Sequence, residues 1–185
     1  MSLVTTLAIV AGSFIGFIIL VAVCILGCHY LYWKGGVNKH NPDMRGKTVV
    51  ITGGTDGIGK ETVIRLAKLG AKVIFTGRSE SKARDVLKSV PQESDVEFKR
   101  VDQSNLIEIK EFADYLFSKI DKIDVLMNNA GLMSSKFKRS QQNIEFTMAV
   151  NHFAHFYLTD LLLPLLKKPE QSRIVNTASL AHTMA

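Results

Sequence analysis

The part of the sequence with the clearest chemical meaning is a glycine-rich turn, TGGTDGIG, at residues 52–59. It follows a β-branched run, 48–52, typical of a strand buried on both faces, and precedes a segment with helical spacing, 60–69. Glycines in such a turn let the backbone approach a pyrophosphate, whose charge is stabilised by the N–H groups and dipole of the helix N-terminus. This context predicts a dinucleotide-binding loop, with a ligand-free tight turn as the alternative.

Two further positions follow predicted strands and bear on the choice of cofactor. Arg78 stands after the second strand, where a free ribose 2′-hydroxyl would usually meet an acidic side chain. A guanidinium suits a 2′-phosphate instead, so the sequence favours NADP(H) over NAD(H), unless Arg78 is an ordinary solvated arginine. Asp102 follows the third strand and either accepts a hydrogen bond from an adenine amine or caps the next helix.

The elements that must position these residues alternate between strand and helix. We expect strands at 48–52, 72–76, 96–101, 125–128 and 173–176, and helices at 60–69, 81–89, 107–120 and about 143–166. Repeated β-α-β units with short connections predict a parallel sheet with helices on both faces, joined by right-handed crossovers.

The first 33 residues differ from the rest of the 185-residue chain, because they contain no Asp, Glu, Lys or Arg although the net charge is +6. The run LAIVAGSFIGFIILVAVCIL at 7–26 predicts one transmembrane helix, with a cleaved signal peptide as the alternative. Basic residues follow at Lys34, Lys39, Arg45 and Lys47, which puts the large domain on the cytosolic or matrix side. Both cysteines, Cys24 and Cys28, lie within these first 33 residues, so a disulfide scaffold is excluded and no metal site is expected.

Several further motifs occur in a characteristic order: NNAG at 128–131, NHFAHF at 151–156, SRIVN at 172–176 and SLAH at 179–182. Together with the glycine turn, they resemble the short-chain dehydrogenase/reductase family, in particular its membrane-associated retinol-dehydrogenase branch. The resemblance implies an α/β fold with a Rossmann-type doubly wound parallel sheet, of which about five strands are present in the order 3-2-1-4-5. It divides the chain into an anchor (1–33), a basic linker (34–45) and an NADP-binding domain (46–185) that is incomplete at its C-terminus.

The resemblance also assigns roles to individual residues. Asn151 would order a proton-relay water, and Ser179 would hold the substrate oxygen; the alternatives are a buried amide and a turn hydroxyl. The cofactor-binding set would comprise Gly53, Thr55, Gly57, Ile58, Gly59, Arg78, Ser79, Asp102, Asn129, Ala130 and Gly131.

The family's Tyr-x-x-x-Lys pair belongs on the helix after the fifth strand, and the sequence stops at Ala185, before that helix. Two other pairs have this spacing. Tyr30 and Lys34 belong to the membrane boundary, and Tyr115 and Lys119 lie on the helix before the fourth strand. Neither position suits a proton donor beside Ser179, so we expect no hydride transfer by these 185 residues alone.

Two functions agree with these features. The first is a membrane-anchored oxidoreductase of the endoplasmic reticulum or mitochondrial inner membrane, transferring hydride between NADP(H) and a lipophilic alcohol or carbonyl. The second is a catalytically inactive Rossmann-fold accessory subunit of a membrane protein complex. Expected partners are membrane lipid and either other subunits or a missing C-terminal half. A nucleic-acid partner is not expected, because the basic residues Lys136, Lys138 and Arg139 are more typical of a solvated loop and no recognised binding motif accompanies them.

Overall fold

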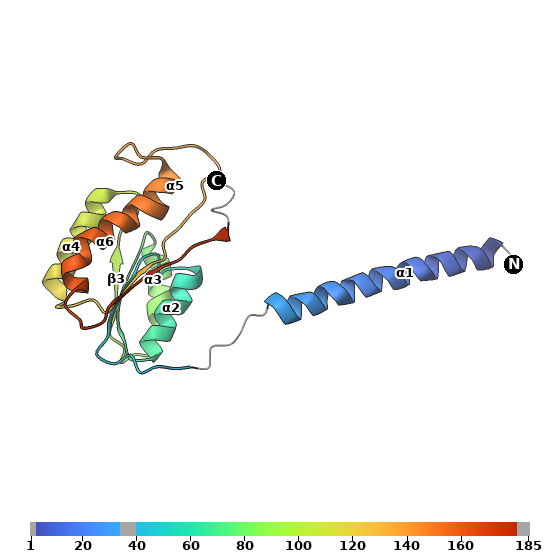
Figure 1. The fold of residues 1–185 in the computed structure, drawn as a ribbon, viewed down its shortest axis with the longest axis horizontal. Coiled ribbons are helices and arrows are strands. Elements are labelled where there is room, and N and C mark those ends of the chain that lie inside the picture. Colours follow the sequence, from blue (N-terminus) through green and yellow to red (C-terminus); the bar gives the residue numbers. More distant parts are fainter. Residues whose placement is uncertain (1–2, 34–39, 181–185) are drawn as a thin grey trace. The chain divides into compact units, whose positions relative to one another are not determined.

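The structure, a computed structural model, describes residues 3–33 and 40–180 of the chain. The chain divides into two compact units, Met1–Asn41 and Pro42–Ala185 (Figure 1). This division falls inside the predicted linker, whose residues 34–39 lie outside the described part of the chain.

The first unit is built on an apolar helix, α1 (Leu3–Cys28), which continues into a π-helical segment, His29–Trp33. The stretch Gly12–Leu31 has 20 residues and a mean hydropathy of 2.5, which makes it a candidate membrane span. At about 1.5 Å per residue, such a helix matches the roughly 30 Å hydrocarbon core of a bilayer. Its large side chains are exposed, with Phe14 66% and Leu26 67% accessible, an arrangement suited to lipid contact.

The second unit contains a five-stranded parallel sheet in the order β3-β2-β1-β4-β5, as the family resemblance implies. The strands are β1 (Thr48–Ile51), β2 (Lys72–Gly77), β3 (Val96–Arg100), β4 (Val125–Asn128) and β5 (Arg173–Asn176). All strands run in one direction, so their carboxyl ends meet at the same edge of the sheet. The order reverses between β1 and β4, and ligands of doubly wound sheets bind at such a switch point.

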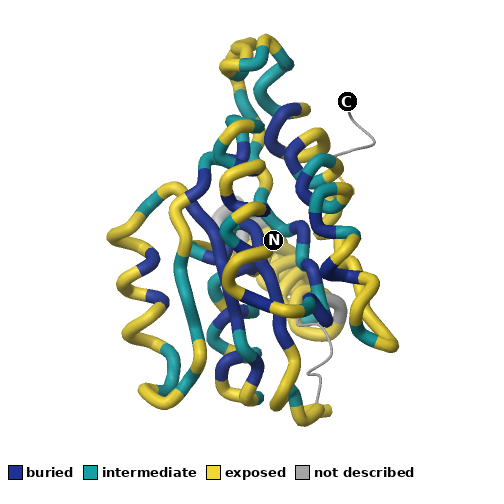
Figure 2. The backbone as a smooth tube through the Cα atoms, turned by 90° about the vertical axis from the view of Figure 1, so that its left-hand side faces the viewer, coloured by how far each residue is buried: buried dark blue, intermediate teal, exposed yellow. Residues whose placement is uncertain are grey.

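Helices cover both faces of this sheet (Figure 1). On one face, α2 (Gly57–Lys68) and α3 (Glu80–Ser89) pack with a cluster that includes Val49 and Ile51. On the other, α4 (Leu106–Lys119) and α6 (Ala154–Leu166) pack with a cluster that includes Val50. Alternate residues of β1 therefore enter opposite cores, which explains its continuous apolar sequence. Figure 2 shows this buried centre surrounded by exposed helix surfaces.

The prediction of one long helix over 143–166 is wrong at its beginning. Asn143 has a left-handed φ of 63°, and the carboxylate of Glu145 accepts hydrogen bonds from Thr147 N and Met148 N, so the helix begins after Glu145. The structure then has a short α5 (Phe146–Met148), a π-helical turn η2 (Ala149–Phe153) and α6. A π-turn inside a helix often marks a functional site, and this one contains Asn151.

Candidate functional site

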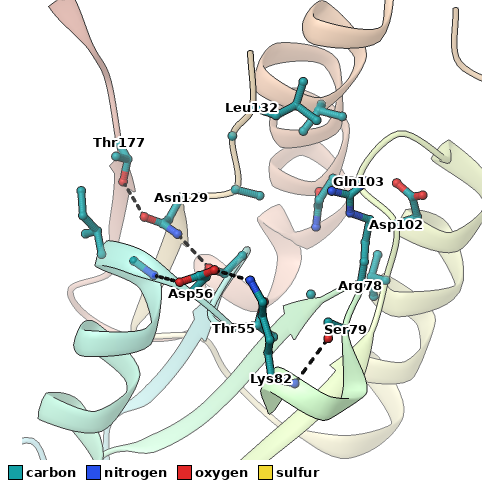
Figure 3. Close-up of a pocket in the computed structure, with 18 residues that line it drawn as sticks. Thr55, Asp56, Arg78, Ser79, Lys82, Asp102, Gln103, Asn129, Leu132 and Thr177 are labelled. Carbon is teal, nitrogen blue, oxygen red and sulfur yellow. Dashed lines mark hydrogen bonds and ion pairs between the residues drawn. The ribbon is translucent and has the colours of Figure 1, made fainter. Parts of the chain in front are cut away.

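A cavity of about 870 Å³ lies at the carboxyl ends of the strands (Figure 3). Its lining comes from the segments that follow all five strands. The predicted cofactor residues other than Gly59 all line it: Gly53, Thr55, Gly57, Ile58, Arg78, Ser79, Asp102, Asn129, Ala130 and Gly131.

The glycine turn is packed so closely against the turn after β4 that side chains do not fit there. Gly53 has a φ of +68°, and a Cβ on it would lie 2.8 Å from Ala130 Cα. A Cβ on Gly59 would lie 2.3 Å from the carbonyl oxygen of Gly53 and 2.5 Å from Nδ2 of Asn129. Gly59 is therefore packed against Gly53 and Asn129, and it lies outside the cavity lining.

An acidic residue at the beginning of α2 is neutralised by a lysine from α3. Asp56 caps the helix by accepting from Gly57 N at 2.8 Å, and it forms an ion pair with Lys82 (Figure 3). The hydrogen bond from Lys82 lowers the pKa of Asp56, so the carboxylate stays ionised. Lys82 thereby offsets a negative charge that would repel a phosphate, and it adds a second cation to the cavity lining.

Arg78 is an exposed residue of the cavity lining, directly after β2. Within residues 3–33 and 40–180 it pairs with no carboxylate. The next residue, Ser79, caps α3 by accepting from Lys82 N at 3.3 Å. A guanidinium, a hydroxyl and a helix N-terminus thus converge on one side of the cavity, a combination that favours a phosphate group.

The segment after β3 supplies the part of the wall beside Arg78 (Figure 3). Oδ1 of Asp102 accepts from the backbone N and the hydroxyl of Ser104, each at 2.8 Å. The cap of α4 is Asn105 rather than Asp102, so the capping alternative for Asp102 does not hold. Beside it, Gln103 is only 6% exposed and its amide donates to Thr76 Oγ1 at 3.3 Å.

A buried hydroxyl connects the glycine turn to the NNAG segment. Oγ1 of Thr52, which is 0% exposed, accepts from Asn129 N at 2.9 Å and from Ala130 N at 3.0 Å. In return, Nδ2 of Asn129 donates to the carbonyl oxygens of Thr52 at 3.0 Å and Gly53 at 3.2 Å. These four bonds fix the position of one turn against the other beneath the cavity.

The same hydroxyl reaches the π-turn through His155. Nε2 of His155 lies 3.1 Å from Thr52 Oγ1. The same oxygen also lies 3.5 Å from the carbonyl oxygen of Met127, so the hydroxyl has two acceptors within reach, His155 and Met127. The ring also hydrogen-bonds the backbone of Asn151. Burial lowers the pKa of His155 below its usual 6.5, with a smaller contribution from His152 in the same direction.

The two predicted catalytic residues do not line the cavity. The side chain of Asn151 holds the adjacent loop, accepting from Leu132 N at 2.9 Å and donating to Leu132 O at 2.8 Å. Ser179 is exposed and follows β5. Residues 181–182, which complete the SLAH motif, lie outside the described part of the chain.

The Tyr115 and Lys119 pair has a different setting, between α4 and β3. The Tyr115 hydroxyl donates to the carboxylate of Glu97, and Lys119 Nζ lies 3.6 Å from the same carboxylate. Burial, followed by this hydrogen bond, raises the pKa of Tyr115 to about 12, opposite to the change that a catalytic tyrosine needs. Neither residue lines the cavity.

Sequence reasoning missed part of the lining because it depends on tertiary packing. The additional residues are Asp56, Gly77, Lys82, Val101, Gln103, Leu132, Val150 and Thr177. For Lys82 a signal exists, since it lies one helical turn after Ser79 on the helix that starts beside Arg78. Thr177 carries no such signal; its hydroxyl lies 3.4 Å from Oδ1 of Asn129.

Comparison with known proteins gives consistent matches. Residues 47–185 match the family described as short chain dehydrogenase. Human retinol dehydrogenase 13 is 37% identical over 154 residues, covering 82% of this chain and 46% of that protein. Bovine retinol dehydrogenase 12 is 35% identical over 173 residues, covering 92% of this chain and 54% of that protein. The chain thus spans about half the length of these relatives.

A solved structure of similar fold is that of a metagenomic short-chain oxidoreductase in complex with NADP. It matches with a TM-score of 0.67 and 29% sequence identity, covering 76% of this chain and 64% of that one.

Proposed function

The chain belongs to the short-chain dehydrogenase family, and from this premise we propose that its cavity binds NADP(H) for hydride transfer to or from an alcohol or carbonyl substrate. The observation that carries the proposal is the pairing of an open glycine turn with Arg78, a cation that has no carboxylate partner among the described residues. The metagenomic relative, solved with NADP, supports this choice of cofactor.

The chemistry of the lining fits such a cofactor. The N-terminus of α2 and the turn from Gly53 to Gly59 have the shape and dipole for a diphosphate. Arg78 and Lys82 have the charge for a 2′-phosphate, and Asp102 can accept from an adenine amine. When bound, the nicotinamide supplies or accepts the hydride.

Residues on the substrate side would have supporting roles. Asn151 fixes the loop at Leu132 through two hydrogen bonds, which keeps the cavity wall in place. Ser179 is proposed to bind the substrate oxygen. Proton transfer in this family uses a Tyr-x-x-x-Lys pair after β5, and residues 177–185 contain none.

The substrate class and the membrane attachment follow from separate features. The relatives named retinol dehydrogenases support a lipophilic alcohol or aldehyde. The span Gly12–Leu31 supports a single-pass anchor, and the basic residues after it favour the cytosolic or matrix side for the domain.

Binding measurements on the full chain in lipid nanodiscs test the cofactor assignment. We expect NADPH to bind at least about tenfold more tightly than NADH, because its 2′-phosphate gains one charge-assisted contact that NADH cannot make. Arg78→Asp should remove this preference, whereas Arg84→Asp, a change of an exposed arginine on α3 outside the cavity, should preserve it. Equal affinities for the two cofactors in the unmodified chain would refute the proposal.

The alternative is a non-catalytic accessory subunit of a membrane complex, in which another subunit would cover β5. This edge strand leaves Ile174 43% and Val175 42% accessible, and an exposed parallel edge tends to acquire a partner. Protein isolated from its native membrane distinguishes the two functions. Oxidation of NADPH with retinal supports the enzyme, and stable co-purification of other subunits without turnover supports the accessory role.

A further inference from the structure

The loop between β4 and α5 exposes large apolar side chains at one end of the domain. In this loop, residues 132–139, Met133 is 88% exposed and Phe137 is 74% exposed. The loop forms the upper tip of the domain in Figures 1 and 2, where the tube is mostly exposed. Such exposure is unfavourable in water unless a partner covers the side chains.

The same loop is strongly basic. Lys136, Lys138 and Arg139 flank Phe137, and no Asp or Glu occurs from Ala130 to Ile144. In the part of the chain that the structure describes, none of these three cations pairs with a carboxylate. The nearest acid along the chain, Glu145, is engaged as the cap of α5.

Hydrogen bonds hold the loop in this shape. Ser134 Oγ donates to Lys136 O at 2.7 Å, and Phe146 N donates to Lys138 O at 3.0 Å. Arg139 Nη1 donates to Asn143 O at 2.8 Å, while its guanidinium lies 5.5 Å from the centre of the Phe137 ring. The apolar side chains and the cations are therefore presented together by an ordered backbone.

We propose that this loop docks on an anionic lipid bilayer, with Phe137 and Met133 entering the headgroup region and the three cations facing lipid phosphates and carboxylates. Interleaved apolar and basic side chains favour such a surface through burial and electrostatic attraction together. The proposal rests on the membrane anchor of the proposed function, since the span ends at Leu31 and the domain unit begins at Pro42. A tether of that length keeps the domain near the bilayer, at most roughly 35–40 Å from the span.

Docking would also connect the cavity to the lipid phase. Leu132 lines the cavity, and its neighbour Met133 is the most exposed apolar residue of the loop. A lipophilic substrate could then pass from the bilayer along this loop, without crossing water, to the end of the cavity beside Gly131.

Fluorescence of the full chain in vesicles tests the docking. The sole tryptophan, Trp33, is changed to phenylalanine, and Phe137→Trp supplies the probe. In vesicles containing phosphatidylserine, we expect the emission of the tryptophan at position 137 to shift to the blue and to be quenched by brominated lipid. In purely zwitterionic vesicles, both the shift and the quenching should be smaller. Ile107→Trp, at a 60% exposed apolar position of α4, is the matched control and should remain unquenched.

Charge variants complete the test. The double variant Lys136→Gln, Lys138→Gln should show equal quenching in the two lipid compositions. The control double variant Lys167→Gln, Lys168→Gln, at an exposed pair after α6, should keep the difference in quenching. Equal quenching at positions 137 and 107, or quenching unaffected by the loop variants, would overturn the proposal. Flotation of the chain with vesicles and NADPH binding are measured in parallel, so that failure of the anchor or of the cofactor site is recognised separately.

Discussion

The most informative substitution is Thr52→Val, because it removes a buried hydroxyl while nearly preserving the shape of the side chain. Oγ1 of Thr52 accepts from the backbone N–H groups of Asn129 and Ala130 and contacts His155. In the valine variant these two N–H groups lose their acceptor in a place that water does not reach, since Thr52 is 0% exposed.

The expected loss in the free energy of unfolding follows from the number of N–H groups left without an acceptor. Each buried donor left without a partner costs about 1–3 kcal/mol, so two cost about 2–6 kcal/mol of the free energy of unfolding. Thr52→Ser is the control, because it keeps the hydroxyl and loses only a methyl group worth about 1 kcal/mol. We therefore expect Thr52→Val to be less stable than Thr52→Ser by at least about 1 kcal/mol.

Urea unfolding of the full chain in nanodiscs, followed by circular dichroism, measures this difference. NADPH titration provides a second readout, since the freed NNAG turn lines the cavity and its displacement should weaken binding. If the two variants have equal stability and equal NADPH affinity, the hydroxyl does not hold the two turns together and the reasoning is wrong.

Three further predictions concern the same site. Gly59→Ala should abolish NADPH binding, because its Cβ would lie 2.3 Å from a backbone oxygen; calorimetry with NADPH measures this, and retained affinity would contradict the packing. Lys82→Met should weaken binding of both cofactors, because it leaves the Asp56 charge unpaired beside the diphosphate, and the loss should be larger for NADPH. Asp56→Asn, which keeps a helix cap and releases Lys82, should bind NADPH at least as tightly as the unmodified chain; the opposite ranking of the two variants would exclude a phosphate role for Lys82. Because the pKa of His155 is lowered in the folded chain, the unfolded chain takes up a proton on this imidazole at higher pH than the folded chain does. The free energy of unfolding should therefore be full above pH 6.5 and fall as the pH drops from 6.5 toward the folded-state pKa. Urea unfolding measures this pH dependence, which should be weaker in His155→Gln; an equal pH dependence in the variant would refute the role of His155.

The fold was largely predictable because its strands have an unambiguous pattern. The run Thr48–Ile51 is continuously apolar or β-branched, and the structure buries it between two helix layers. The start of the helix after β4 was not predictable, because it depends on the left-handed Asn143 and the cap at Glu145. The π-turn likewise depends on tertiary contacts around Asn151 that periodicity does not report.

The candidate site was predictable where chemistry and chain position coincide. Glycines after β1 and Arg78 after β2 could be identified because strand ends of a parallel sheet converge. Lys82 and Thr177 reach the cavity through packing of α3 and pairing of β5, which a single sequence does not specify. The basic, apolar loop at 132–139 was visible as a run of cations, but the exposure of Phe137 required the structure.

The most direct test is an experimental structure of the full chain with NADPH bound. The account predicts that the diphosphate lies against the N-terminus of α2, between the glycine turn and Asn129, with the 2′-phosphate beside Arg78. A nucleotide bound elsewhere, or a glycine turn closed by side chains with no density for a nucleotide at saturating NADPH, would contradict it.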